Sequence, residues 1–174
     1  MRLFHVSEDP NLSVFEPRIP TRADLDPEVP LVWALDEEHL PNFLTPRDCP
    51  RVAYQTGVNT TDEDAARFFT PPHRYTLVIE SGWFPLFAQT TLWLYEFDPS
   101  GFIKQDDAAG YWVATTTQTP IGKLCVNDLF DELFRRNVEL RVVENLWPIA
   151  DSVQGSSLQW SLCRMRNACE RQTL

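Results

Sequence analysis

The sequence predicts an α+β fold with mixed, largely antiparallel sheets and about three or four short helices. Three observations lead to this class. About seven or eight segments have the alternation, or the β-branched and aromatic content, of strands. Fewer segments carry the 3.6-residue spacing of helices. Strands and helices do not alternate regularly along the chain, which argues against a doubly wound fold.

The composition is that of one globular domain, and we expect a single domain over residues 1–174, of which 43% are hydrophobic. Six Trp and eleven Phe predict a core or groove built largely from rings. No apolar run approaches the roughly 20 residues of a bilayer span, and no apolar region follows Arg2, so neither a membrane span nor a signal peptide is expected. The four cysteines form no CxxC pair, which favours reduced thiols and a cytoplasmic location.

The N-terminal part of the chain begins with a strand predicted over 2–7, where apolar residues flank a histidine. Residues 8–28 are rich in proline and predict a long irregular crossing, a kind of loop that often has a function. The run 29–35 predicts a buried strand. Asp36 and the glutamates after it predict a short helix that ends before Pro46.

The rest of the chain contains further strand-like segments, predicted at 51–55, 74–80, 91–97, 110–117, 138–143 and 157–163. A helix is expected from Thr60 until Pro71 stops it. The clearest helix is predicted over about 126–136, with Asp128 in its first turn. Its predicted apolar stripe consists of Val126, Leu129, Phe130, Leu133 and Phe134.

Several common chemistries have no signature in this sequence. Neither a P-loop nor GxGxxG, HExxH or GxSxG occurs. Histidines at 5, 39 and 73 lack metal-ligand spacing, so no metal site is expected. The net charge of −10 argues against nonspecific binding of nucleic acid.

His5 is the most suggestive single residue. A titratable ring on a rigid strand, beside the hydroxyl of Ser7, has the character of a binding or catalytic group. A buried, hydrogen-bonded structural histidine is an equally good interpretation of the same pattern.

The order of groups after His5 resembles the ADP-ribosyltransferase-like fold with its split β core, in the histidine–aromatic–glutamate branch. His5 is followed by a crossing that contains Arg18, then by Trp33 in a second strand and by Glu139 in a late strand. The resemblance implies that His5 binds a ribose, that Trp33 stacks on nicotinamide and that Glu139 stabilises an oxocarbenium-like centre. NAD is the cosubstrate that it implies. The family usually has tyrosine where Trp33 stands, and glycine with threonine or serine after the histidine.

The whole chain also resembles an uncharacterised bacterial family, a domain of unknown function. The segments that carry this resemblance are FHVSEDP at 4–10, VWALDEEHLPNFL at 32–44, PRDCPRV at 46–52 and RMRNA at 164–168. This resemblance implies one intact domain and no particular activity.

The loop 46–51 is the second local concentration of interest. Prolines stiffen it, and Arg47 and Arg51 beside Asp48 are suited to bind a phosphate or carboxylate. A structural salt-bridged turn is the alternative. Positive neighbours also lower a thiol pKa, so a nucleophilic Cys49 is a further hypothesis.

Other polar side chains admit two interpretations each. Glu80 and Glu96 are rivals of Glu139 for the role of an acid. The C-terminal Arg164, Arg166 and Asn167 either close a polar site or are simply solvated, and Arg166 with Asn167 is equally suited to anchor the tail through backbone carbonyls. An exposed aromatic patch around residues 83–87 would indicate self-association, although the sequence leaves the oligomeric state open.

Two functions follow from these observations. The first is an ADP-ribosyltransferase-like transferase or glycohydrolase that acts at an anomeric carbon of NAD or a related nucleotide. The alternative is a non-catalytic module that binds a small anionic ligand or a protein partner through the same cleft, near His5, Trp33 and Arg47. Catalysis requires the carboxylate of Glu139 to point into that cleft. A pair between Glu139 and Arg141 would count against catalysis.

Overall fold

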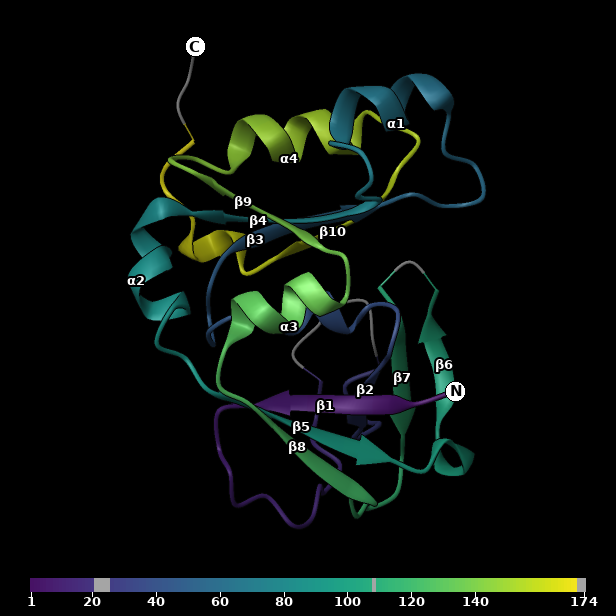
Figure 1. Ribbon diagram of the computed structural model, residues 1–174. Coiled ribbons are helices and arrows are strands. Elements are labelled where there is room, and N and C mark those ends of the chain that lie inside the picture. The colour runs from purple at the N-terminus through teal and green to yellow at the C-terminus, as the bar shows by residue number, and fades with distance from the viewer. Residues whose placement is uncertain (21–25, 108, 172–174) are drawn as a thin grey trace. The chain divides into compact units, whose positions relative to one another are not determined.

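The computed structural model describes residues 1–20, 26–107 and 109–171 (Figure 1). Its chain forms two compact units, and each unit combines two separate stretches of sequence. The first unit comprises Met1–Leu40 and Leu92–Val126, and the second comprises Pro41–Thr91 and Asn127–Leu174. Two sheets and, in the described residues, four α-helices give the α+β class that the sequence predicts. The single domain over 1–174 stays a prediction.

The first unit is built on a six-stranded sheet with the order β6-β7-β2-β1-β5-β8. Its strands are β1 (Leu3–Ser7), β2 (Val32–Asp36), β5 (Leu92–Phe97), β6 (Ile103–Asp106), β7 (Tyr111–Ala114) and β8 (Gly122–Val126). All the neighbouring pairs are antiparallel. A short 3₁₀ turn, η3 (Pro99–Gly101), lies between β5 and β6. The sequence prediction lacks β6 and β8 because these edge strands are mostly exposed and have no apolar alternation.

One face of this sheet is covered by the crossing that follows β1. The ring of Phe15 lies 5.3 Å from that of Tyr95 and 5.0 Å from that of Phe97. The hydroxyl of Tyr95 donates to the carbonyl of Asp9 at 2.7 Å, which fixes the start of the crossing. Irregular backbone is therefore held by aromatic packing and side-chain hydrogen bonds. Residues 21–25 of the predicted crossing 8–28 lie outside the described part of the chain.

The second unit contains a four-stranded sheet with the order β10-β3-β4-β9. Its strands are β3 (Arg51–Gln55), β4 (Tyr75–Glu80), β9 (Glu139–Val143) and β10 (Gln159–Cys163). Strands β4 and β9 are parallel and the other pairs are antiparallel, so the mixed, largely antiparallel character is confirmed. Parallel neighbours need a long connection, and here the stretch Leu92–Val126 of the first unit lies within it.

The α-helices all belong to the second unit, and 3₁₀ turns lie around them. The elements are η1 (Leu40–Phe43), α1 (Asp62–Phe68), η2 (Ser81–Trp83), α2 (Phe84–Phe87), α3 (Leu129–Arg135), α4 (Trp147–Gln154) and η4 (Met165–Asn167). Helix α1 begins where expected, since the Thr61 side chain accepts from the backbone N–H of Asp64. The helix expected after Asp36 is only the 3₁₀ turn η1, which contains Pro41. Figure 1 shows α1 and α4 on one side of the four-stranded sheet.

Helix α3 is shorter than the predicted segment 126–136. Asp128 caps it by accepting from the N–H of Asp131, and Asn137, at φ 55°, ends it in the left-handed region. The predicted apolar stripe divides into two parts. Leu129 and Leu133 are buried, whereas Phe130 and Phe134 are exposed and Val126 belongs to β8.

None of the helices within residues 1–20, 26–107 and 109–171 has the length and apolar character that crossing a bilayer requires.

Candidate functional site

His5 is half-buried in β1 of the first unit. Its Nδ1–H donates to the backbone carbonyl of Trp33 at 3.1 Å. Its ring centroid lies 4.8 Å from that of Phe15 in the crossing. Because Nδ1 carries the proton, a neutral His5 ring has its acceptor at Nε2. The side chain thus ties β1 to β2 and packs under the crossing.

The indole of Trp33 lies on the opposite face of the same sheet. Val32 and Ala34 pack with Phe15 in one core cluster, and successive side chains of a strand alternate between faces. Trp33 therefore points away from that cluster, and its ring stands edge-on to Tyr111 at 5.2 Å. His5 and Trp33 meet through a carbonyl, not through two side chains that line one surface.

Two further predicted binding residues of the first unit have backbone roles. The hydroxyl of Ser7 accepts from the N–H of Asp9 at 3.1 Å and so shapes the turn after β1. Arg18 forms a two-way backbone bridge with Leu31, at 3.0 and 2.8 Å, and its side chain is exposed.

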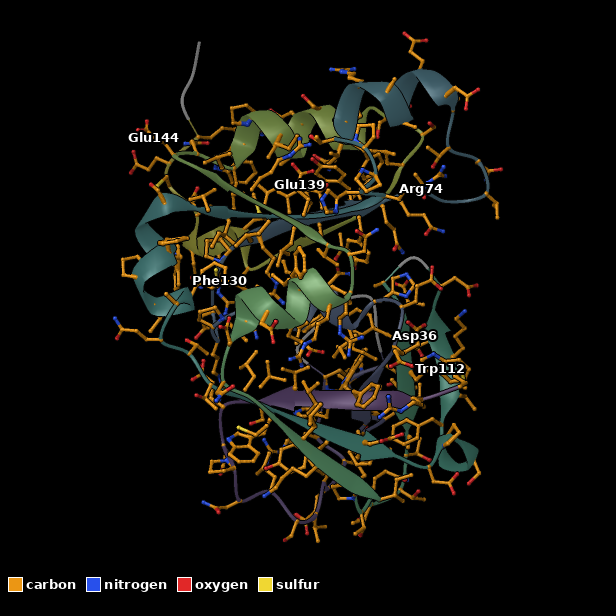
Figure 2. All side chains as sticks on the ribbon, in the orientation of Figure 1. Asp36, Arg74, Trp112, Phe130, Glu139 and Glu144 are labelled. Carbon is orange, nitrogen blue, oxygen red and sulfur yellow. The ribbon has the colours of Figure 1, made fainter. Side chains whose placement is uncertain are left out.

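Glu139 begins strand β9 of the second unit and is labelled in Figure 2. Its carboxylate is bound on both oxygens by Arg141, whose Nε donates to Oε1 at 3.1 Å and whose Nη2 donates to Oε2 at 3.0 Å. The hydroxyls of Thr70 and Thr76 donate to the same carboxylate at 3.4 and 3.3 Å. Arg141 also donates to the carbonyl of Phe68 at 2.7 Å. A carboxylate paired with Arg141 in this way counts against a catalytic role of Glu139.

The electrostatics of Glu139 agree with that geometry. Partial burial disfavours its charged form, but the hydrogen bonds and the charge of Arg141 outweigh burial and hold the pKa below its usual value. A glutamate that acts as a general acid needs a raised pKa instead. Electrostatic stabilisation of a cation by this carboxylate would compete with Arg141.

The rival acids are also engaged. Glu80 is buried at the end of β4 and accepts from the N–H groups of Leu146 and Cys169 at 3.1 Å and, through its second oxygen, from Cys169 at 3.0 Å. Glu96 accepts two hydrogen bonds from Arg2, at 2.8 and 2.9 Å. Both carboxylates join distant parts of their own unit.

Arg51 is only 4% exposed, so the expectation that its guanidinium is presented to a ligand does not hold in this geometry. Its Nε donates to the carbonyl of Asn42 at 2.7 Å and its Nη1 to that of Cys49 at 3.0 Å. The guanidinium lies 4.8 Å from the centre of the Phe43 ring. The inward position follows from β3, whose five residues are all buried.

Cys49 is fully buried. Burial raises its pKa to about 12, with the charge of Arg51 lowering it in part and that of Glu80 raising it further. The thiolate that a nucleophile requires is therefore strongly disfavoured.

An arginine cluster, defined as Arg164 and Arg166 with Asp48, joins the loop 46–51 to the segment after β10. Arg164 Nε and Arg166 Nη2 lie 3.5 and 3.9 Å from the same oxygen, Oδ1 of Asp48. Asn167 Nδ2 donates to the Asp48 carbonyl at 2.7 Å, so the C-terminal segment is anchored to the loop as one sequence interpretation expected. Arg47 precedes Asp48 and is exposed.

The backbone of the arginine cluster is unusual at two positions. Asp48 (φ 64°) and Arg164 (φ 54°) both adopt the left-handed region. Such residues are uncommon outside glycine and are often found at functional sites. The loop and the C-terminal arginines can each be singled out from the sequence. The sequence gives no signal, however, that β10 brings Arg164 and Arg166 to the loop before β3.

A carboxylate–imidazole pair in the first unit was missed. His39 Nδ1 donates to Asp36 Oδ1 at 2.7 Å, and both side chains are largely buried. Although burial disfavours the charged form of Asp36, the hydrogen bonds from His39 hold its pKa below the usual value. Figure 2 shows Asp36 near Trp112 in this unit. The signal that could have predicted this pair is the spacing of Asp36 and His39, which lie three residues apart directly after a predicted strand.

A model of a family of unknown function (DUF6886) matches residues 4–168. The chain belongs to this family. Since the match extends through both units, membership in DUF6886 applies to nearly the whole chain, and the expectation of an uncharacterised family is confirmed. No curated protein and no solved structure matches the chain. The ADP-ribosyltransferase-like core therefore stays a prediction.

Proposed function

We propose that this DUF6886 chain is a non-catalytic cytoplasmic module that binds a small anionic ligand, with a phosphate or carboxylate group, at the arginine cluster. The observation that carries the proposal is that Arg164 and Arg166 share a single oxygen of Asp48. Two guanidinium groups against one carboxylate leave a net positive charge at this site.

The geometry of the shared carboxylate favours exchange with a ligand. Separations of 3.5 and 3.9 Å are longer than a direct hydrogen bond, and all three side chains are at least 44% exposed. An exposed pair of this kind contributes little to stability. A phosphate can therefore accept forked hydrogen bonds from the guanidinium groups without breaking a strong internal contact.

The surroundings also support a positioned anion site. Asp48 and Arg164 adopt left-handed conformations, and the hydrogen bond from Asn167 joins their two segments. Because this hydrogen bond holds the two segments together before a ligand binds, binding needs to order less of the chain around the arginine side chains. The four cysteines are free, which supports the reducing cytoplasm that the sequence predicts.

The NAD-directed transferase or glycohydrolase has less support. The carboxylate proposed to stabilise its cationic centre, that of Glu139, is neutralised by Arg141, and His5 and Trp33 point to opposite faces of their sheet. NAD and ADP-ribose nevertheless belong in the ligand panel because both contain a pyrophosphate. Nicotinamide release by the wild type, abolished in Glu139→Gln, would favour the enzyme over the module.

The test is a thermal-shift titration with inorganic phosphate, ADP-ribose, NAD and nicotinamide. Ligands that bind only the folded chain raise the melting temperature with concentration. We expect shifts with the anionic ligands and none with nicotinamide, which has no anionic group. In Arg164→Asn/Arg166→Gln the shifts should disappear, with asparagine chosen because it tolerates the left-handed backbone.

The matched control is Arg74→Ala, which removes an exposed arginine elsewhere in the second unit (Figure 2). It should retain the full shifts. Equal shifts in the wild type and the double variant would refute the arginine cluster as the site. No shift with any anion would refute the proposed function itself.

A further inference from the structure

An apolar patch lies on the outer surface of α2 and α3 in the second unit. We define it as Phe84 of α2 with Phe130 and Phe134 of α3. These residues are 42%, 36% and 77% exposed, respectively. The rings of Phe84 and Phe130 are 5.6 Å apart, so the two helices contribute to one continuous surface. Figure 2 labels Phe130 on α3.

A buried aromatic residue lies beneath the patch. Fully buried Phe87 supports it from below, with its ring 5.1 Å from that of Phe130. Leu129 and Leu133 are the residues of α3 that pack into the core, whereas Phe130 and Phe134 remain exposed. Contiguous exposed aromatic side chains of this kind are typical of interfaces.

Charges beside the patch have a self-complementary order. Helix α3 has two ion pairs at i,i+4 spacing. Glu132 and Arg136 form the inner pair, with side chains 12% and 20% exposed. Asp131 and Arg135 form the outer pair, whose side chains are 49% and 68% exposed and join at 2.7 Å.

Helical geometry places the outer pair on one flank of the patch. At about 100° per residue, Phe130 and Phe134 share the centre of a face, and residues 131 and 135 follow one another along the same side of it. When two such helices pack antiparallel about a two-fold axis, equivalent flanks face each other in opposite directions. Asp131 then lies opposite the partner's Arg135, and by the two-fold symmetry Arg135 lies opposite the partner's Asp131.

We propose that the chain forms a two-fold homodimer through the apolar patch, with α3 antiparallel to the same helix of a second copy. A second copy fits better than a basic partner, even though the net charge is −10. The flank of the patch carries one acid and one base. This order of charges is complementary to the same two charges on an antiparallel second copy, and it is not complementary to a uniformly positive surface.

The experiment is sedimentation velocity of the full chain over a concentration series, from about 1 to 300 μM, a range that brackets micromolar affinity. We expect the wild type to shift from monomer to dimer. Phe134→Asp should remain monomeric, and its circular dichroism melt should be unchanged because Phe134 makes little packing in the monomer. The control Val58→Asp alters an apolar residue that is 98% exposed in the same unit, and it should dimerise like the wild type.

A charge exchange tests the antiparallel contact. Asp131→Arg places two positive charges opposite each other, and we expect the dimer dissociation constant to rise about tenfold or more. Adding Arg135→Asp restores opposite charges across the interface and should restore dimerisation. A wild type that is monomeric at every concentration would overturn the proposal. A dimer that survives Phe134→Asp, or a double exchange that fails to rescue, would overturn it equally.

Discussion

Glu139 and Arg141, two residues apart on strand β9, form a two-point ion pair in which Arg141 Nε and Nη2 each bind one oxygen of the carboxylate. Residues at this spacing share one face of a strand, so the pair is built into the strand itself. The same guanidinium reaches the carbonyl at the end of α1. The pair thus joins the sheet to a helix, a structural task that accounts for both side chains.

Replacing Glu139 by glutamine should destabilise the chain by about 1 kcal/mol, a magnitude set by its partial exposure. Its pKa is depressed from the usual 4.5, so its stabilisation is complete above that pH and is lost as the pH falls through the lower native pKa. The difference in melting temperature between wild type and Glu139→Gln should therefore shrink below about pH 4.

Glu144→Gln is the control for that pH series, because Glu144 is an exposed glutamate just after β9 (Figure 2). Its melting curves should follow those of the wild type at every pH. A constant difference between wild type and Glu139→Gln from pH 3 to 7 would contradict the ion pair.

Gly110→Ala should destabilise the chain by roughly 2 kcal/mol or more. Gly110 has φ +66°, and an added Cβ would overlap the ring of His39. The overlap would displace His39 from Asp36. Denaturant unfolding measures the loss, and Gly82→Ala is the control because its added methyl group meets nothing within 4 Å. Equal stabilities of the two variants would contradict the packing of His39 on Gly110.

Glu80→Ala should cost roughly 3 kcal/mol because it leaves the amides of Leu146 and Cys169 without their acceptor. Glu80→Gln retains one carbonyl oxygen and should lose less. Hydrogen exchange should accelerate at both amides in Glu80→Ala. Unchanged protection at Cys169 would show that another group holds the C-terminal segment.

Cys49 should be inert to thiol reagents in the folded chain, since it is fully buried and its pKa is about 12. Mass spectrometry after brief treatment with iodoacetamide should find label on exposed Cys125 and none on Cys49. In denaturant both should react. Rapid labelling of native Cys49 would revive the hypothesis of a nucleophile.

Much of the fold could be predicted because local patterns agree with it. Strand β3 lies at the expected residues 51–55, and α1 (Asp62–Phe68) lies within the segment expected to be helical between Thr60 and Pro71. Helix α4 was missed although Asn145, which accepts from the N–H of Trp147, and Pro148 are signals of a helix start. The helix has only eight residues, of which Ala150 and Val153 are buried, so its apolar periodicity is weak. The edge strands β6 and β8 were missed because exposure removes the apolar alternation.

The candidate site was less predictable because its contacts are distant in sequence. Arg51 and Arg47 look alike in the sequence, yet strand β3 turns the first inward and the loop leaves the second exposed. The approach of Arg164 to Asp48 depends on the pairing of β10 with β3. No local pattern encodes such long-range pairing.

Isothermal titration of ADP-ribose into the wild type and into Arg164→Asn/Arg166→Gln tests the central claim most directly. We predict saturable binding to the wild type that weakens as salt is added, because the contact is between exposed charges. The double variant should bind at least about tenfold more weakly, the loss expected for one charged hydrogen bond. Equal affinity in both proteins, or affinity independent of salt, would contradict the claim that the arginine cluster receives an anion.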